Sequence, residues 1–159
     1  MEQKNYTFKR ADLSDIDTLV NTRITVLRAA NKLSDDTDMS EVETESRRYY
    51  EQSLADGSHT AYIVFDGDKF IGAGGISYYS VMPTYHNRTG RKAYVMNMYT
   101  HPDYRRQGIA YKTLDMLISD AESKGVDDIT LEATDMGRPL YERFGFEPLP
   151  SEMGFVKRK

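Results

Sequence analysis

The sequence predicts an α+β (mixed α/β) domain in which a mixed sheet carries helices on both faces. Two observations support this: strand-like and helix-like segments follow one another in a defined order, and an apolar central segment runs directly into a helix. The chain of 159 residues is long enough for one hydrophobic core and too short for two ordinary ones. We therefore expect one domain over residues 1–159.

The N-terminal third predicts one strand and two helices. Tyr6 and Phe8 alternate with polar neighbours, which is typical of a half-buried strand. Apolar residues then recur at helical spacing over residues 13–27 and indicate an amphipathic helix. After a polar break, the highly charged residues 39–54 predict a second helix that ends near Gly57.

The middle of the chain predicts a hairpin that leads to the central strand. Residues 59–66 and 70–80 are strand-like and are separated by a turn at Gly67 and Asp68. A loop over residues 80–92 follows and holds several polar side chains. The apolar strand after this loop is expected at the centre of the sheet.

The second strand of that hairpin contains Gly72, Gly74 and Gly75. A dinucleotide-binding loop would require a helix directly after the glycines and a different spacing, and neither is present. Glycines inside a strand more often mark a bulge or a close approach of two backbones. We interpret these three glycines in that way.

The C-terminal third predicts a helix, a strand, a short helix and further strands. The first helix starts near Ala110 and ends at Gly125, because glycine readily adopts the left-handed conformation after a helix. Residues 126–133 form the expected buried strand, and residues 137–144 the short helix. Residues 146–156 are expected to return as the final strands, as a hairpin.

The most informative segment is YVMNMYTHPDYRRQGIAY, residues 94–111, where the central strand meets a basic turn and a helix start. N–H groups at a helix start have no intrahelical partners, so with the positive end of the helix dipole they can bind a phosphate. Arg105 and Arg106 add positive charge beside them. Gly108 has no β-carbon, which would let a ligand and the neighbouring strand approach the backbone.

This pattern resembles the signature of the Gcn5-related N-acetyltransferases (GNAT). The family's pyrophosphate loop has Gln or Arg, then Gly, then Gly or Ala, which correspond here to Arg105, Gly108 and Ala110. The segment LYERFGF, residues 140–146, resembles a second family element, and the order of strands between them agrees. The resemblance covers most of the chain. It implies a GNAT-like central sheet that is mixed but mostly antiparallel, and acetyl-CoA as cosubstrate.

The resemblance also implies residues that contact the cofactor. A splayed central strand would leave the backbone N–H of Met98 free to polarise the acetyl carbonyl, and Thr100 would bond the pantetheine arm through its backbone. Thr134 stands where many members have asparagine, and it can still donate a hydrogen bond. An uninterrupted strand would instead place Met96, Met98 and Thr100 on one face as ordinary core residues. The loop expected to hold the pyrophosphate consists of Arg105, Arg106, Gln107, Gly108, Ile109 and Ala110.

Acyl transfer to an amine also needs a proton donor for the departing thiolate and an acceptor for the ammonium proton. Tyr141 matches the tyrosine that many members use as the general acid, although a purely structural packing role is the alternative. The base is open among Glu132, Asp135, His86 and a chain of waters. Tyr94 occupies the position where some relatives carry a catalytic glutamate. The other two histidines are not candidates for the base. His59 lies at a strand start, and His101 precedes Pro102 in the family's usual turn.

Composition narrows the class of protein. A net charge of -4 argues against a nucleic-acid binder, and zero cysteines exclude disulfides and an acyl-enzyme on a thiol. No apolar run approaches the ~20 residues of a membrane helix. The polar start does not resemble a secretory signal, so we expect a cytoplasmic protein that contacts neither nucleic acid nor membrane. No metal is expected, and a homodimer is possible because relatives often dimerise.

We therefore expect an acetyl-CoA-dependent N-acetyltransferase that moves an acetyl group to a primary amine of a small molecule or peptide, by direct attack in a ternary complex. One alternative is the same fold acting on a larger acyl group, and another is a noncatalytic acyl-CoA-binding sensor or interaction module. Tyr78, Tyr79, Tyr85 and the acidic residues 35–45 suggest an aromatic and acidic acceptor pocket. A polyamine, an aminoglycoside or a peptide amine would be compatible with it. The basic cluster of the middle of the chain, expected to suit a polyanionic cofactor, contains Arg88, Arg91, Lys92, Arg105 and Arg106.

Overall fold

The computed structural model describes residues 5–157, which are built around one five-stranded sheet. The strands lie in chain order, and each pairs antiparallel with its neighbour except for the last two, which are parallel. The prediction of a mixed, mostly antiparallel sheet is confirmed. The strands are β1 (Thr7–Arg10), β2 (His59–Asp66), β3 (Lys69–Ser80), β4 (Arg91–Thr100) and β5 (Ile129–Leu131).

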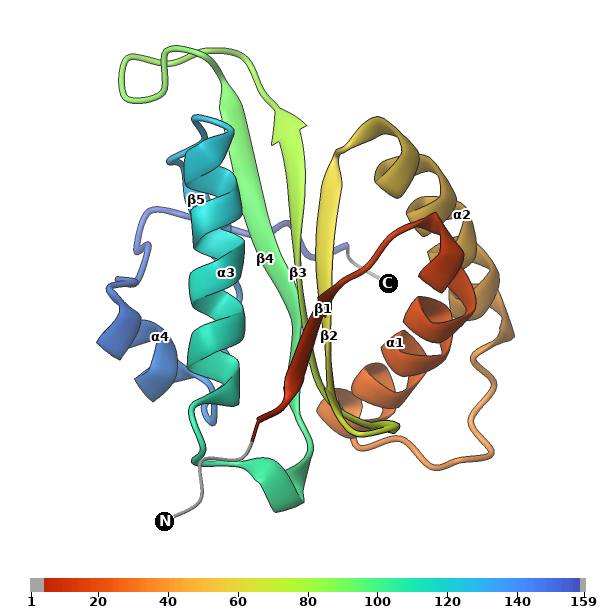
Figure 1. The fold of residues 1–159 in the computed structure, drawn as a ribbon. Helices are drawn as coiled ribbons and strands as arrows, with labels where there is room; N and C mark the ends of the chain where they lie inside the picture. Colours follow the sequence, from red (N-terminus) through yellow and green to blue (C-terminus); the bar gives the residue numbers. More distant parts are fainter. Residues whose placement is uncertain (1–4, 158–159) are drawn as a thin grey trace.

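Helices cover both faces of the sheet, as predicted (Figure 1). The helices α1 (Ile16–Asn31) and α2 (Ser40–Asp56) lie together on one face. The helices α3 (Ile109–Ser123) and α4 (Arg138–Phe144) lie on the other. Single 3-10 turns precede α1 and follow β4. None of the helices within residues 5–157 combines the length and apolar character that a membrane crossing requires.

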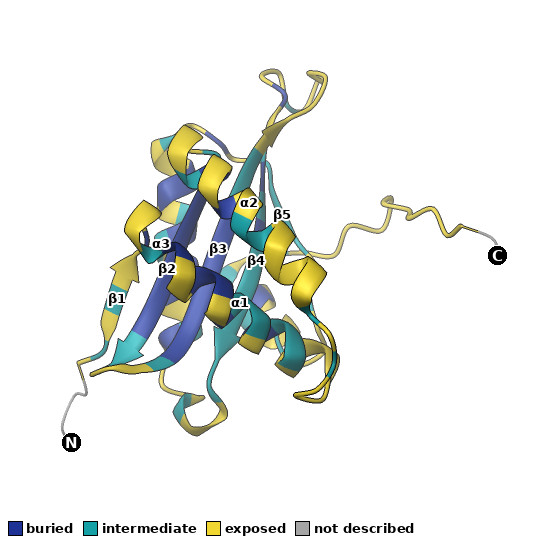
Figure 2. Cartoon of the chain, turned by 90° about the vertical axis from the view of Figure 1, so that its right-hand side faces the viewer, coloured by how far each residue is buried: buried dark blue, intermediate teal, exposed yellow. Residues whose placement is uncertain are grey.

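The sheet is buried on both sides, and this explains why its inner strands are apolar without strict alternation. Figure 2 shows β2 and β3 as buried ribbons behind the exposed outer faces of α1 and α2. One buried cluster lies under α3 and includes Leu114, Ile76 and Val95. A second cluster, under α1 and α2, includes Leu19 and Ile63. The two clusters bury opposite faces of the same strands.

The glycines of β3 allow close packing on both faces, which confirms the interpretation of a close approach. A β-carbon at Gly74 would lie 2.6 Å from Thr113 of α3 and 2.8 Å from the sulfur of Met98. One at Gly75 would lie 2.8 Å from Nε2 of His59 on the opposite face. These distances are shorter than real β-carbon contacts, so larger residues would push the layers apart.

A β-bulge interrupts β4 opposite Gly74. Gly75 pairs with Met96 while Ala73 pairs with Tyr99, so two residues of β4 face a single residue of β3. Asn97, the first of these two residues, has a φ of 59°. The bulge moves every later side chain of β4 to the opposite face.

This bulge rules out the alternative of an uninterrupted strand. Met96 and Asn97 both lie on the face of α1 and α2, where Asn97 bonds to Arg23 of α1. Met98 instead packs against the cluster under α3. Met96 and Met98 therefore do not share a face, although they are two residues apart.

The C-terminal part differs most from the prediction. The strand expected over residues 126–133 is only the three half-buried residues of β5. The hairpin expected over residues 146–156 is wrong, because residues 145–157 form no strand. The segment after α4 extends away from the sheet and the helices (Figure 2). Phe155 is 94% exposed there, so no neighbouring strand within residues 5–157 buries the apolar side chains that suggested the hairpin.

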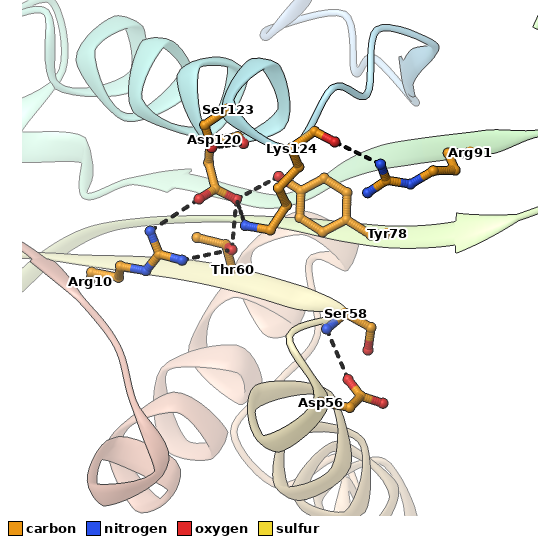
Figure 3. Close-up of polar contacts among 9 residues, drawn as sticks. All are labelled: Arg10, Asp56, Ser58, Thr60, Tyr78, Arg91, Asp120, Ser123 and Lys124. Carbon is orange, nitrogen blue, oxygen red and sulfur yellow. Dashed lines mark hydrogen bonds and ion pairs between the residues drawn. The ribbon is translucent and has the colours of Figure 1, made fainter. Parts of the chain in front are cut away.

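A buried carboxylate joins one end of the sheet to α3 (Figure 3). Arg10 of β1 donates to Oδ1 of Asp120 at 3.0 Å. Thr60 of β2 and Tyr78 of β3 donate to Oδ2 at 2.8 and 2.5 Å. Lys124, just after α3, also donates to Oδ2 at 2.8 Å. The aspartate therefore connects α3 with three adjacent strands.

These donors determine the ionisation of Asp120. Burial alone raises the pKa of this carboxyl, but the hydrogen bonds from Lys124, Tyr78 and Thr60 outweigh burial and hold the pKa below its usual 3.8. A carboxylate whose pKa is lowered by folding stabilises the folded chain at pH values above its unfolded pKa. The stabilisation is lost as the pH falls through the folded-state pKa.

Replacing Asp120 by asparagine is expected to lower the free energy of unfolding at pH 7 by about 2–4 kcal/mol, because it removes the charge that pairs two buried donors and two cations. The difference between Asp120→Asn and wild type should shrink when the pH is lowered below the usual carboxyl pKa of 3.8. Urea unfolding of the two proteins at pH 7 and at acidic pH measures the loss of stability and its dependence on pH.

The matched control is Asp115→Asn, which changes an exposed carboxylate on the same helix. Its effect should stay within about 0.5 kcal/mol. Equal destabilisation by the two variants, or a difference for Asp120→Asn that does not depend on pH, would contradict the role assigned to Asp120.

Candidate functional site

The loop between β4 and α3 offers backbone donors at a helix start. Gly108 is the N-cap of α3 with a φ of 80°, and Ile109 is the first helical residue. The side chain of Ile109 is buried against the sheet and anchors this end of α3. The hydroxyl of Tyr6 donates to Oε1 of Gln107 at 2.6 Å and holds the loop against the start of the chain. The first turn of α3, with Ala110 half-buried, leaves N–H groups without intrahelical partners.

Two arginines make this loop cationic. Arg105 and Arg106 are exposed, and neither forms an ion pair with a carboxylate among residues 5–157. A β-carbon at Gly108 would meet no protein atom within 4 Å. The expected close approach of a neighbouring strand at Gly108 is therefore wrong. Glycine is favoured there by its positive φ, and the space beside it is open to a ligand.

The predicted basic cluster is divided between two ends of β4. Arg88 and Arg91 lie at the start of this ten-residue strand, whereas Arg105 and Arg106 lie beyond its end. A strand of that length spans about 30 Å. Only the second pair can therefore contribute charge at the start of α3.

The central strand is splayed beside this loop. Pairing between β4 and β5 runs from Ala93 with Ile129 to Val95 with Leu131 and then stops. The remaining five residues of β4 have no partner strand on the β5 side within residues 5–157. The N–H groups that point away from β3 over these five residues therefore have no partner in β5, and we call the place where β4 parts from β5 the opening.

The bulge determines which N–H groups face this opening. The N–H of Ala93 donates to Asp128 on the β5 side at 2.9 Å, but the N–H of His101 donates to Ile71 of β3 at 2.7 Å. Because successive N–H groups of a strand point to opposite sides, those of Thr100 and Met98 point away from β3. Without the bulge, the alternation that starts at Ala93 would have directed them towards β3.

Two threonines border the same region. Oγ1 of Thr100 is buried and has no hydrogen-bond partner among residues 5–157. Oγ1 of Thr134 accepts the N–H of Gly137 at 3.1 Å in the first turn before α4. That bond uses an acceptor site of the hydroxyl, so its proton is still available to a ligand.

Tyr141 of α4 is 9% exposed and packs in the cluster that also contains Val95 and Met98. Burial raises the pKa of its phenol above the usual 10.0, so the hydroxyl is protonated at neutral pH. No hydrogen bond from this hydroxyl to another residue is formed within residues 5–157. The ring lies against Gly137, where a β-carbon would come within 3.0 Å of it. The absence of a β-carbon at Gly137 makes room for the ring.

A cavity of about 620 Å³ lies on the opposite face, between α2, α1 and the strands β3 and β4. Tyr78 borders the cavity, but its ring packs in the cluster under α3 and its hydroxyl donates to Asp120 on the other face of the sheet. The expectation of an aromatic and acidic pocket holds for Tyr79 and the acidic start of α2, which contribute to the lining. It is wrong for Tyr85, which is 79% exposed in the loop after β3. The polar and aromatic lining consists of Arg23, Glu41, Glu45, Ser46, Tyr49, Tyr50, Ser58, His59, Ser77, Tyr78, Tyr79 and Asn97, with Val42 and Met96.

The candidate bases lie outside this cavity. His86 is exposed in the loop before β4, and Glu132 and Asp135 are exposed near β5. None of these three side chains is part of the lining.

Sequence reasoning missed Arg23, Tyr49 and His59 as members of the cavity. His59 is 5% exposed, and burial, with a smaller contribution from the charge of Arg23, lowers its pKa to about 4. Its Nδ1 lies 2.8 Å from the hydroxyl of Tyr49 and 3.1 Å from Oγ of Ser77. No sequence signal links these residues, because they lie on four separate elements: α1, α2, β2 and β3.

Comparison with known proteins agrees with this geometry. Residues 27–146, more than half of the chain, match the model of the Acetyltransferase (GNAT) family. The chain is 29% identical over 93 residues to the uncharacterized N-acetyltransferase YsnE of Bacillus subtilis (strain 168), which covers 55% of this chain and 56% of that protein. It therefore spans about half the length of this curated relative.

Solved structures resemble almost the whole chain. A predicted acetyltransferase from Clostridium acetobutylicum, crystallised with acetyl-CoA, is 32% identical with a TM-score of 0.86 and covers 96% of each chain. A GCN5-related N-acetyltransferase from Ralstonia eutropha JMP134 has a TM-score of 0.81 at 22% identity, over 96% of this chain and 99% of that one, which supports the fold. With the family match and the splayed strand beside a cationic helix start, these similarities show that the chain belongs to the GNAT family of N-acetyltransferases.

Proposed function

We propose that this chain transfers an acetyl group from acetyl-CoA to a primary amine of a small molecule or peptide, by direct attack in a ternary complex. The observation that carries the proposal is the position of Met98. Its N–H faces the opening between β4 and β5, a few residues before the cationic loop that starts α3. A thioester in this opening could therefore be polarised while its diphosphate is bound by the helix start.

The residues present fit such a cosubstrate. The N–H groups at the start of α3 and the charges of Arg105 and Arg106 would hold the diphosphate, with open space beside Gly108 for it. The N–H of Thr100 and the hydroxyl of Thr134 would bond the pantetheine arm. Similarity to the Clostridium protein, which was crystallised with acetyl-CoA, supports the choice of donor.

Each chemical role then falls to a defined group. Acetyl-CoA supplies the thioester carbonyl, and the N–H of Met98 donates to its oxygen, where negative charge develops during attack. The hydroxyl of Tyr141 donates its proton to the leaving sulfur, which its raised pKa permits at neutral pH. The proton of the attacking amine leaves through water in the cavity, because a buried His59 with a pKa of about 4 is too weak a base to retain it.

Calorimetric titration is expected to show saturable binding of acetyl-CoA and coenzyme A but not of ATP. Arg106→Gln should weaken acetyl-CoA binding about fivefold at low salt, and less at high salt, because an exposed charge contributes roughly 1 kcal/mol and is screened. Arg88→Gln, at the other end of β4, is the matched control and should bind like wild type. Absence of binding to a folded sample would refute the proposal.

Turnover is expected to depend on the hydroxyl of Tyr141. Tyr141→Phe should lower kcat by about 100-fold while leaving the Kd for acetyl-CoA unchanged, because the ring still packs and only the proton donor is lost. Release of free thiol in the presence of amines measures kcat, with Tyr85→Phe as the control. Cofactor binding without thiol release for any amine would favour the noncatalytic sensor, and faster release from a longer acyl-CoA would favour a larger donor.

A further inference from the structure

Arg23 is a cation of the cavity that lacks an anionic partner. It extends from α1 into the lining and is half-buried. Within residues 5–157, no carboxylate lies within ion-pair distance of its guanidinium. A partly buried charge without a partner is costly unless a bound anion compensates it.

Asn97 holds this guanidinium in place. Nη1 of Arg23 donates to Oδ1 of Asn97 at 3.0 Å, a bond between α1 and the bulge of β4. Asparagine tolerates the φ of 59° at this position better than most residues, so the bulge itself presents the acceptor. A guanidinium has five N–H donors in a planar fork that matches a carboxylate, and this bond uses only one of them.

The location of Arg23 limits the distance between the two functional groups of an acceptor. Asn97 immediately precedes Met98, and consecutive α-carbons are about 3.8 Å apart. An anion held by Arg23 therefore lies close to the strand position proposed to polarise the acetyl group. An acceptor that fills both places carries its carboxylate near its amine, as an α-amino acid does.

The rest of the cavity describes the side chain and the ammonium group. Tyr49, Tyr79 and Met96 provide aromatic and apolar surface. Glu41 of α2 forms no ion pair within residues 5–157, so it can attract an incoming ammonium group. A polyamine would place a further positive charge beside Arg23, where it would be repelled.

We propose that the acceptor is a free α-amino acid with an apolar or aromatic side chain, whose carboxylate is bound by Arg23 and thereby positioned by Asn97. The proposal rests on the proposed acetyltransferase function and specifies its substrate class. It separates this chain's acceptor from the polyamines, aminoglycosides and internal peptide amines that the sequence left open.

The test compares acetylation of phenylalanine, phenylalaninamide and spermidine by wild type, Arg23→Gln and Arg47→Gln. Phenylalanine has a carboxylate that its amide lacks. Their amines also differ in basicity, but this difference cancels when the KM of a variant is divided by the KM of wild type for the same substrate. Arg23→Gln should raise the KM for phenylalanine roughly 10- to 100-fold and leave the KM values for the amide and for acetyl-CoA unchanged. Arg47→Gln changes an arginine of α2 that lies outside the cavity and pairs with Asp17, so this variant should behave like wild type.

A second variant separates binding from folding. Asn97→Gly keeps a residue that accepts the positive φ but removes the bond to Arg23. It should raise the KM for phenylalanine by a smaller factor than Arg23→Gln, with binding of acetyl-CoA retained.

The outcomes distinguish the two proposals. If acetyl-CoA does not bind to folded protein, the acetyltransferase function fails. If acetyl-CoA binds and amines are acetylated, but spermidine or the amide is preferred over phenylalanine, only the acceptor class is overturned. Equal KM increases for phenylalanine and its amide in Arg23→Gln would overturn it as well. The acceptor class would also be overturned if phenylalanine is not acetylated and does not bind, in calorimetry, to protein loaded with coenzyme A.

Discussion

The extra residue in β4 is the constraint on which the site depends. One residue of β3, Gly74, faces two residues of β4, and this mismatch reverses the direction of the later N–H groups and side chains. Met98 thereby presents its N–H to the opening beside β5 and its side chain to the cluster under α3. Asn97 presents its side chain to the opposite face, where it meets Arg23. A regular strand could not provide both arrangements.

The glycines of β3 make this arrangement compatible with a dense core. The sulfur of Met98 and the side chain of Thr113 occupy the space that a β-carbon at Gly74 would need, and His59 does the same at Gly75. Beside the bulge, side chains from both faces therefore lie directly against the backbone of β3. At the other end, Asp120 joins α3 to three strands through three donors, and Lys124 supplies a fourth donor from the end of α3 itself, so the C-terminal end of this helix is fixed to the sheet.

The sheet separates two electrostatic environments. On one face, Arg105 and Arg106 are exposed beside free backbone donors, which suits a mobile polyanion whose attraction depends on salt. On the other face, Arg23 is half-buried and held by a neutral amide, so its charge is screened less. The opening between β4 and β5 lies between them. In the proposed reaction, a donor and an acceptor would meet there from opposite faces.

The sequence by itself determined the order of the helices and of the five strands, the family and the cationic loop before α3, because these depend on local periodicity and on a short motif. The helix boundaries agree closely: the predicted residues 39–54 became Ser40–Asp56, and Gly125 ends α3 with a φ of 71° as expected. Sequence patterns failed where the outcome depends on a partner distant in the chain. Residues 146–156 carry apolar side chains that suggested strands, but they form no strand within residues 5–157.

Only the tertiary structure decided the register of β4 and the composition of the cavity. A bulge is a relation between two strands, and nothing within YVMNMYT marks Asn97 as the extra residue. Arg23, Tyr49 and His59 converge because α1, α2 and the sheet pack together, although their positions in the chain are unrelated. Local chemistry therefore specified the loop that would hold the cofactor. Packing between distant segments specified which charge faces the cavity.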